Sequence, residues 1–300
     1  MENSVKLRAR AKINLSIDIK GIFDDGYHDV EMVMQSVNLS DYIIIRKAEK
    51  GFKITSSNSD VPLDKRNIIY KTWELLREKY AIDSGVSIFL EKNIPIAAGM
   101  AGGSTDSAAM FVGLNKLFRL GMSEEEMLEE SKKLGSDIAF CIKGGTYLAT
   151  GTGTDLKKLP FLDRNIRVLI CKPDIFVSTK RVYKKFDSMY EENFNPLERP
   201  DNKLLIEGLQ EKNKEKIVDA MGNVLEPVTK SWCKEIEKIE KTMNRFGSYA
   251  TMMSGSGPTV FGFFNDYRSI KKCSNVLRKK YRQTYITSTS DKGVEIYGNK

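Results

Sequence analysis

The chain has 300 residues, a formal net charge of +8, 41% hydrophobic residues and 29% charged residues. This length suits one large domain or two ordinary ones, and the composition excludes a disordered chain. No apolar run reaches the ~20 residues that a membrane-spanning helix needs. A strand pattern is expected from about Val5, which leaves no room for a signal peptide, so we expect a cytoplasmic protein.

The charged residues, the cysteines and the single histidine indicate which classes of ligand or partner the protein can bind. The basic residues are scattered and no aromatic RNA-binding motif accompanies them, so an acidic small molecule is favoured over nucleic acid or a membrane. The single histidine, His28, cannot build a histidine-rich metal site, and no protein metal site is expected. Nothing in the sequence specifies an oligomeric state. The distant spacing of the cysteines predicts buried thiols rather than disulfides or zinc ligands at Cys141, Cys171, Cys233 and Cys273.

The first half of the chain predicts strands and helices in mixed order. Alternation in 12–19 predicts a strand with Ile13, Leu15, Ile17 and Ile19 on one apolar face, so that Lys12 and Asn14 share the opposite, polar face. Further strands are expected at 30–39, 41–48, 52–57 and 86–93. Helices are expected at 67–80, at 105–121, from a capping box of Ser123 and Glu126 to about 134, and briefly after 135, before a glycine-rich hairpin.

The second half begins a new pattern, and we place a domain boundary between residues 160 and 161. A strand is expected at 166–173, helices near 203–221, 226–245 and 267–281, a strand–loop–strand unit over 248–264, and strands at the C-terminus. This mixed order predicts an α+β fold rather than a doubly wound parallel sheet.

The stretch "PIAAGMAGGSTDS" at 95–107 lies between a predicted strand and a predicted helix. Free N–H groups at a helix N-terminus, preceded by small residues, suit a phosphate group. We expect Gly102 and Gly103 to tolerate no large side chain, and Ser104 or Thr105 to add a hydroxyl contact. An ordinary strand-to-helix turn is the alternative. The spacing fits neither a Walker loop nor a dinucleotide fingerprint.

Several motifs together resemble the GHMP family of small-molecule kinases: "AKINLSIDIKG" with "DGYHDV", then "PIAAGMAGGSTDSA", "GSDIAF" and "MMSGSGPTVF". The resemblance implies a two-domain GHMP kinase fold, with an N-terminal ATP-binding domain at 1–160, a C-terminal substrate-side domain at 161–300 and an active-site cleft between them. It implies ATP as co-substrate with Mg²⁺. The implied ATP-binding residues are Ala97, Ala98, Gly99, Met100, Ala101, Gly102, Gly103, Ser104, Thr105, Asp106 and Ser107.

Two residues are implied to carry the chemistry. By resemblance, Asp137 is the catalytic carboxylate that accepts the proton of the substrate hydroxyl, and Lys12 is its cationic partner. From the residues alone, Asp137 also fits a helix cap, and Lys12 also fits a solvated strand lysine.

Other residues are implied to hold the substrate. Asn14 is expected to bond the polyol or diphosphate, while Tyr27 and His28 are expected to hold a cytosine, with Tyr183 as a second ring and Thr179 beside it. A surface turn and core packing are the plain alternatives. The pairing of Lys12 and Asn14 with "DGYH" points to a family member that phosphorylates the 2-hydroxyl of a CDP-linked methylerythritol in non-mevalonate isoprenoid synthesis.

Two other functions stay open on the sequence. One is a family member that acts on homoserine, mevalonate or a sugar, none of which carries a base for the Tyr27–His28 turn. The other is a non-catalytic, basic nucleotide- or RNA-binding protein, against which Lys12 and Asp137 together speak. The loop at 253–258 is expected to close over phosphates, and the segment 222–228 receives no role.

Overall fold

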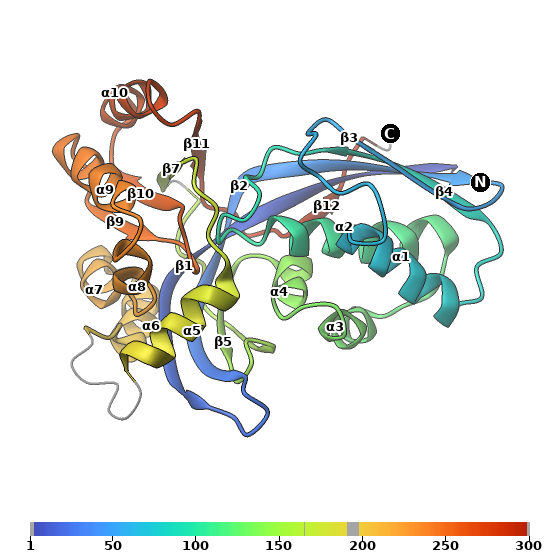
Figure 1. Ribbon diagram of the computed structural model, residues 1–300, viewed down its shortest axis with the longest axis horizontal. Helices are drawn as coiled ribbons and strands as arrows, with labels where there is room; N and C mark the ends of the chain where they lie inside the picture. The colour runs from blue at the N-terminus through green and yellow to red at the C-terminus, as the bar shows by residue number, and fades with distance from the viewer. Residues whose placement is uncertain (1–2, 165, 191–197, 299–300) are drawn as a thin grey trace.

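The computed structural model describes residues 3–164, 166–190 and 198–298. Two sheets organise this α+β chain, and Figure 1 shows one in each half of the molecule. The strands are β1 (Ser4–Ile22), β2 (His28–Ala48), β3 (Phe52–Ser56), β4 (Gly85–Glu91), β5 (Thr146–Thr150), β6 (Asp155–Lys158), β7 (Arg167–Lys172), β8 (Gly222–Asn223), β9 (Ala250–Met253), β10 (Val260–Phe264), β11 (Gln283–Ser288) and β12 (Val294–Ile296).

The helices are interspersed among these strands, singly or in runs of two or three. They are α1 (Ile68–Lys79), α2 (Gly102–Phe118), α3 (Glu124–Lys132), α4 (Asp137–Lys143), α5 (Thr179–Met189), α6 (Asn202–Glu211), α7 (Lys214–Ala220), α8 (Glu226–Lys230), α9 (Glu235–Arg245) and α10 (Tyr267–Arg278). None of the helices in the described part of the chain is long and apolar enough to cross a membrane.

The first sheet has the strand order β12-β1-β2-β4-β3, with β5 and β8 added beside β2 and β1. Helices α1 to α4 lie on one side of its long strands in Figure 1. The second sheet, β11-β7-β10-β9, lies beside helices α9 and α10. The chain therefore leaves the first sheet after β6 and returns to it with β8 and β12, which pair with β1.

The strand β1 departs from the predicted simple alternation. Its pairing with β2 shifts register between Asn14 and Ser16, and the four predicted apolar residues divide between two cores. Ile13 and Leu15 belong to one core cluster, whereas Ile17 and Ile19 belong to a second, larger cluster, and each cluster includes residues of both halves of the chain. A bulge inserts one residue, so side chains after it exchange faces relative to the partner strand.

Three further differences concern element boundaries. The stretches predicted at 30–39 and 41–48 are one continuous strand, β2, because it pairs with β1 along its length. The helix predicted near 203–221 is two helices, because Lys212 adopts a left-handed φ of 55° and Asn213 caps α7. The helix predicted near 226–245 is likewise divided into α8 and α9.

Other predictions are confirmed. Ser123 accepts a hydrogen bond from the backbone N–H of Glu126 at 3.1 Å, as the capping pattern indicated. All four cysteines are buried free thiols. Burial raises the pKa of the Cys171 thiol to about 12, so it stays protonated and unreactive at neutral pH.

Candidate functional site

The predicted catalytic pair lies where β1 meets α4. The side chains of Lys12 and Asn14 are buried, and Lys12 is only 4% exposed, which excludes a solvated strand lysine. The Lys12 ammonium donates to Asn14 Oδ1 at 2.6 Å and lies 3.8 Å from Asp137 Oδ2. Asp137 begins α4, and its side chain is 26% exposed. A buried cation thus faces a carboxylate that a ligand can reach.

The first glycine-rich loop, residues 95–101, joins this pair to the N-terminus of α2. Ala97, Gly99 and Ala101 all have a left-handed φ, of 49°, 69° and 56°. Left-handed residues that alternate with others turn successive N–H groups toward one concave side, a backbone form that binds anions. The backbone N–H of Lys12 donates to Met100 O at 3.3 Å, so the loop is attached to the strand that carries Lys12.

Packing restricts Gly102 and Gly99 but not Gly103. A Cβ on Gly102 would lie 3.0 Å from Ile94 Cγ2 and 3.2 Å from Lys92 Nζ, so this position leaves little room for a side chain, as expected. A Cβ on Gly103 would meet only Ile68, at 3.8 Å, so protein packing does not exclude a side chain there. Gly103 lies in the exposed first turn of α2, which begins at Gly102, earlier than predicted. A Cβ on Gly99, in contrast, would lie 2.1 Å from Ser254 O, so only glycine fits.

Three predicted ATP-binding side chains point into the protein. Thr105 Oγ1 donates to the carbonyl of Arg10 at 2.6 Å, and Ser107 Oγ lies 2.7 Å from Thr72 Oγ1. Asp106 is likewise buried. Of the two predicted hydroxyl residues, Ser104 is therefore the one that stays partly exposed.

The second glycine-rich loop, residues 254–258, packs directly on the first. Ser254 Oγ donates to Gly99 O at 3.0 Å, and a Cβ on Gly255 would lie 2.8 Å from the same carbonyl oxygen. Ser256 Oγ lies 2.8 Å from Thr179 Oγ1 at the start of α5. The loop therefore connects the first loop with a predicted substrate-binding residue.

The turn between β1 and β2 brings the predicted base-binding residues to α5. His28 Nε2 lies 2.7 Å from Asp187 Oδ1, and the His28 and Tyr183 rings are 4.6 Å apart at 53°. A neutral His28 that donates from Nε2 to Asp187 keeps Nδ1 as an acceptor. Tyr27 is 65% exposed. Asp187 was not predicted, because it lies 159 positions from His28.

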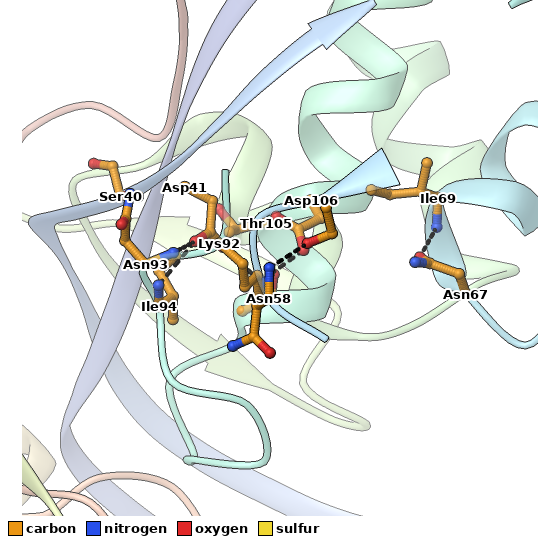
Figure 2. A network of polar contacts seen from close by, with 12 residues as sticks. Ser40, Asp41, Asn58, Asn67, Ile69, Lys92, Asn93, Ile94, Thr105 and Asp106 are labelled. Atoms are coloured by element: carbon orange, nitrogen blue, oxygen red, sulfur yellow. Dashed lines mark hydrogen bonds and ion pairs between the residues drawn. The ribbon is translucent and has the colours of Figure 1, made fainter. Parts of the chain in front are cut away.

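A buried charge cluster, missed from the sequence, lies behind the first loop (Figure 2). The Lys92 ammonium donates to Asp41 at 2.5 Å, to Asp106 at 2.6 Å and to the carbonyl of Gly102 at 3.0 Å. Burial raises the pKa of Asp106 well above its usual value, although Lys92 opposes this shift. Burial lowers the pKa of Lys92, but the charges of Asp106 and Asp41 outweigh it and raise that pKa.

Two observations limit where ligands are sought. A cavity of about 840 Å³ lies between the 160–167 connection, α6–α7 and β10, and none of the predicted site residues lines it. The catalytic assignment therefore rests on the Lys12–Asp137 geometry and not on cavity size. Within the described ranges, no cluster of three or more His, Cys, Asp or Glu side chains is arranged to hold a metal ion.

Comparison with known proteins defines the class. The family model for the N-terminal domain of GHMP kinases matches residues 67–145, and the model for their C-terminal domain matches residues 205–283. The chain belongs to the GHMP kinase family.

Two curated relatives match nearly the whole chain. The chain is 46% identical over 295 residues to a 4-diphosphocytidyl-2-C-methyl-D-erythritol kinase of Clostridioides difficile, covering 98% of each chain. It is 43% identical over 279 residues to the kinase of the same name from Bacillus licheniformis, covering 93% of this chain and 94% of that one.

Solved structures show the same fold. A crystal structure of 4-(cytidine 5'-diphospho)-2C-methyl-D-erythritol kinase matches with a TM-score of 0.79 at 24% identity, covering 95% of this chain and 99% of the other. A homoserine kinase from Cytophaga hutchinsonii matches with a TM-score of 0.76 at 20% identity, covering 99% and 98%.

Proposed function

We propose that this protein transfers the γ-phosphoryl group of ATP to the 2-hydroxyl of 4-diphosphocytidyl-2-C-methyl-D-erythritol, giving the 2-phosphate and ADP in non-mevalonate isoprenoid synthesis. The observation that carries the proposal is the buried Lys12 ammonium 3.8 Å from the Asp137 carboxylate, beside two interlocked glycine-rich loops. The names of relatives that share 46% and 43% identity support the choice of acceptor.

Each residue of the pair has a defined task in this reaction. Asp137 accepts the proton of the substrate's 2-hydroxyl. The hydroxyl oxygen bonds to the γ-phosphorus of ATP as the bond between that phosphorus and the ADP oxygen breaks. Lys12 stabilises the negative charge on the attacking oxygen and the transferring group. Because Asn14 accepts from the Lys12 ammonium at 2.6 Å, it holds that ammonium in place as well as facing the substrate.

ATP is assigned to residues 97–107, which comprise most of the first loop and the first turns of α2, mainly through backbone N–H groups at the start of that helix. Mg²⁺ binds through oxygen ligands and substrate phosphates. Ser104 offers a hydroxyl at a partly exposed position in the first turn of α2, so it fits a nucleotide-bound Mg²⁺. When bound, the ion neutralises charge on the phosphates.

The cytidine end is assigned to the turn at 25–28 and to α5. The exposed ring of Tyr27 offers a stacking surface, and His28 Nδ1 offers an acceptor to an exocyclic amine. Tyr183 supports the His28 ring, and Thr179 joins this side of the site to the second loop. We also propose the division at 160/161, with β8 and β12 as exceptions that pair with the first sheet, and a cytoplasmic location.

The test is release of ADP with a panel of alcohols. We expect turnover with the CDP-linked substrate and very little with 2-C-methyl-D-erythritol 4-phosphate, homoserine, mevalonate or sugars, because a site built for a polar edge strongly rejects ligands that lack it. Asp137→Asn should lower kcat by about 10²-fold or more and leave ATP affinity in place. Faster turnover of homoserine or mevalonate, or near-wild-type kcat in Asp137→Asn, contradicts the proposal.

A further inference from the structure

The segment from Asn223 to Lys230 holds the second glycine-rich loop by its backbone, and most of it lies in the stretch 222–228, to which the sequence analysis gave no role. Asn223 Nδ2 donates to the carbonyls of Met253 and Gly255, both at 2.9 Å. Thr229 Oγ1 donates to Ser256 O at 3.1 Å. Both side chains are buried. These bonds fix the end of β9 and the loop that follows it, in addition to the backbone bond from Ser254 N–H to Thr259 O at 2.9 Å.

A carboxylate completes this attachment. Glu226 Oε2 accepts a hydrogen bond from the backbone N–H of Met253 at 2.7 Å, and Glu226 Oε1 accepts from the Lys230 ammonium at 2.6 Å. Lys230 also lies 2.6 Å from Glu240 Oε2 on α9. The ammonium therefore orients the carboxylate that holds the start of the loop.

The same segment is joined to the catalytic strand. β8 pairs in parallel with β1, with Gly222 opposite Ser16 and Asn223 opposite Ile17. This pairing begins two residues after Asn14 in β1. The segment therefore connects the second loop with the strand that carries Lys12, so the position of the loop depends on the position of that strand.

The loop in turn contacts both sides of the proposed site. Ser254 bonds the carbonyl of Gly99 in the first loop, and Ser256 bonds Thr179 on α5. A shift of the loop backbone would therefore move the phosphate side and the acceptor side together. Misplacement by about 1 Å can cost an enzyme on the order of 10²-fold in rate.

We infer that Asn223, Glu226 and Thr229 are positioning residues for the kinase reaction, which act by setting the second glycine-rich loop against the first. The inference rests on the proposed function for the acceptor, but its effect on ATP binding needs only membership of the kinase family. None of the three residues has to touch a substrate for this role.

The experiment uses substitutions that change hydrogen bonding and keep shape. Thr229→Val removes the donor to Ser256, and Thr229→Ser retains it. Asn223→Asp turns a donor toward two carbonyls into an acceptor. The matched controls are Asn213→Asp, since aspartate caps a helix as well as asparagine does, and Glu237→Gln, which removes an exposed carboxylate paired with Lys241.

We expect Thr229→Val and Asn223→Asp to weaken ATP binding by about tenfold in calorimetry and to lower kcat/KM for the acceptor by at least that factor. Thr229→Ser and both controls should match the wild type. Thermal unfolding measured in parallel separates folding from positioning. If Thr229→Val keeps its melting temperature, ATP affinity and kcat/KM, the inference is overturned.

This design also separates the inference from the proposed acceptor. ATP affinity is measured without any alcohol, so an incorrect acceptor abolishes turnover in every protein, including the wild type, and leaves the calorimetric difference intact. Equal loss of ATP affinity in Thr229→Val and Thr229→Ser would show that packing, and not the hydroxyl donor, holds the loop, and would also overturn the inference.

Discussion

The two glycine-rich loops are each supported by one lysine between two carboxylates. Behind the first loop, Lys92 lies 2.5 Å from Asp41 and 2.6 Å from Asp106. Behind the second, Lys230 lies 2.6 Å from both Glu226 and Glu240. In each cluster one carboxylate oxygen is buried without a hydrogen-bond partner, Asp106 Oδ1 in the first and Glu240 Oε1 in the second.

The clusters differ in their access to water. The Lys92 side chain is 4% exposed and the Lys230 side chain is 29% exposed. Burial, followed by the charge of Glu226, raises the pKa of Glu240 to about 7. Burial raises the pKa of Asp106 well above its usual value. The first loop is thus supported by a closed charge cluster, whereas the second is supported by one that water reaches and that titrates near neutral pH.

The largest expected effect comes from removing the central cations. Lys92→Met leaves two buried carboxylates without their cation and should destabilise the fold by about 3–5 kcal/mol. Lys230→Met should cost only about 1 kcal/mol, because water partly replaces the lost ammonium. Denaturant unfolding measures both, with the exposed Lys132→Met as the control. Equal losses from the two clusters would remove the distinction between them.

The contact between the loops is tested by Gly99→Ala. The new Cβ would lie 2.1 Å from Ser254 O, so the loops must separate, and kcat/KM should fall by about 10–100-fold. Gly121→Ala is the matched control, because Gly121 also has a left-handed φ, of 72°, but nothing lies within 4 Å of its Cβ position. An equal fall of kcat/KM in Gly99→Ala and Gly121→Ala would mean that backbone strain, and not the contact between the loops, causes the loss.

The titration of the second cluster predicts a pH dependence of stability. Because the pKa of Glu240 is raised from 4.5 to about 7 on folding, the folded state holds more protons, and stability falls as pH rises between these values. Glu240→Gln lacks this loss, so its stability relative to the wild type should increase from pH 5 to pH 8 by on the order of 1 kcal/mol.

Glu237→Gln is the control for that measurement, because the pKa of Glu237 is shifted in the opposite direction from that of Glu240. Hydrogen bonding from Lys241 lowers the pKa of Glu237, so removal of this carboxylate should not produce the same gain above pH 5. Parallel pH–stability curves for the wild type and Glu240→Gln would show that the second cluster does not titrate near neutrality.

The smallest expected effect concerns the residues that adopt left-handed conformations. The first loop uses alanine at 97 and 101, whereas the second uses Gly255 and Gly257, with φ of 60° and 82°. Ala101→Gly relieves steric strain but increases the freedom of the unfolded chain, so these effects nearly cancel and stability should change by less than about 1 kcal/mol. Calorimetric unfolding would detect a larger change, which would show that the contact of Ala101 with the core outweighs this balance.

Local patterns in the sequence determined much of the fold. Periodicity predicted β1, α1 and α10, the capping residue Ser123 placed the start of α3, and the glycine-rich motifs located both loops. These features depend on neighbours within a few residues, so short-range backbone and side-chain preferences suffice to predict them. The expected closeness of Lys12 and Asp137 came from the family resemblance, and the structure agrees at 3.8 Å.

Only the tertiary structure decided which polar residues meet. Lys92 lies 51 positions from Asp41, and Asn223 lies 30 positions from Met253, so no local pattern links them. The bulge in β1 and the return of β12 to the first sheet likewise depend on pairing with distant strands. Buried polar groups must find partners when water is removed, and the partner that each one finds is set by how the chain packs, not by its own neighbours in sequence.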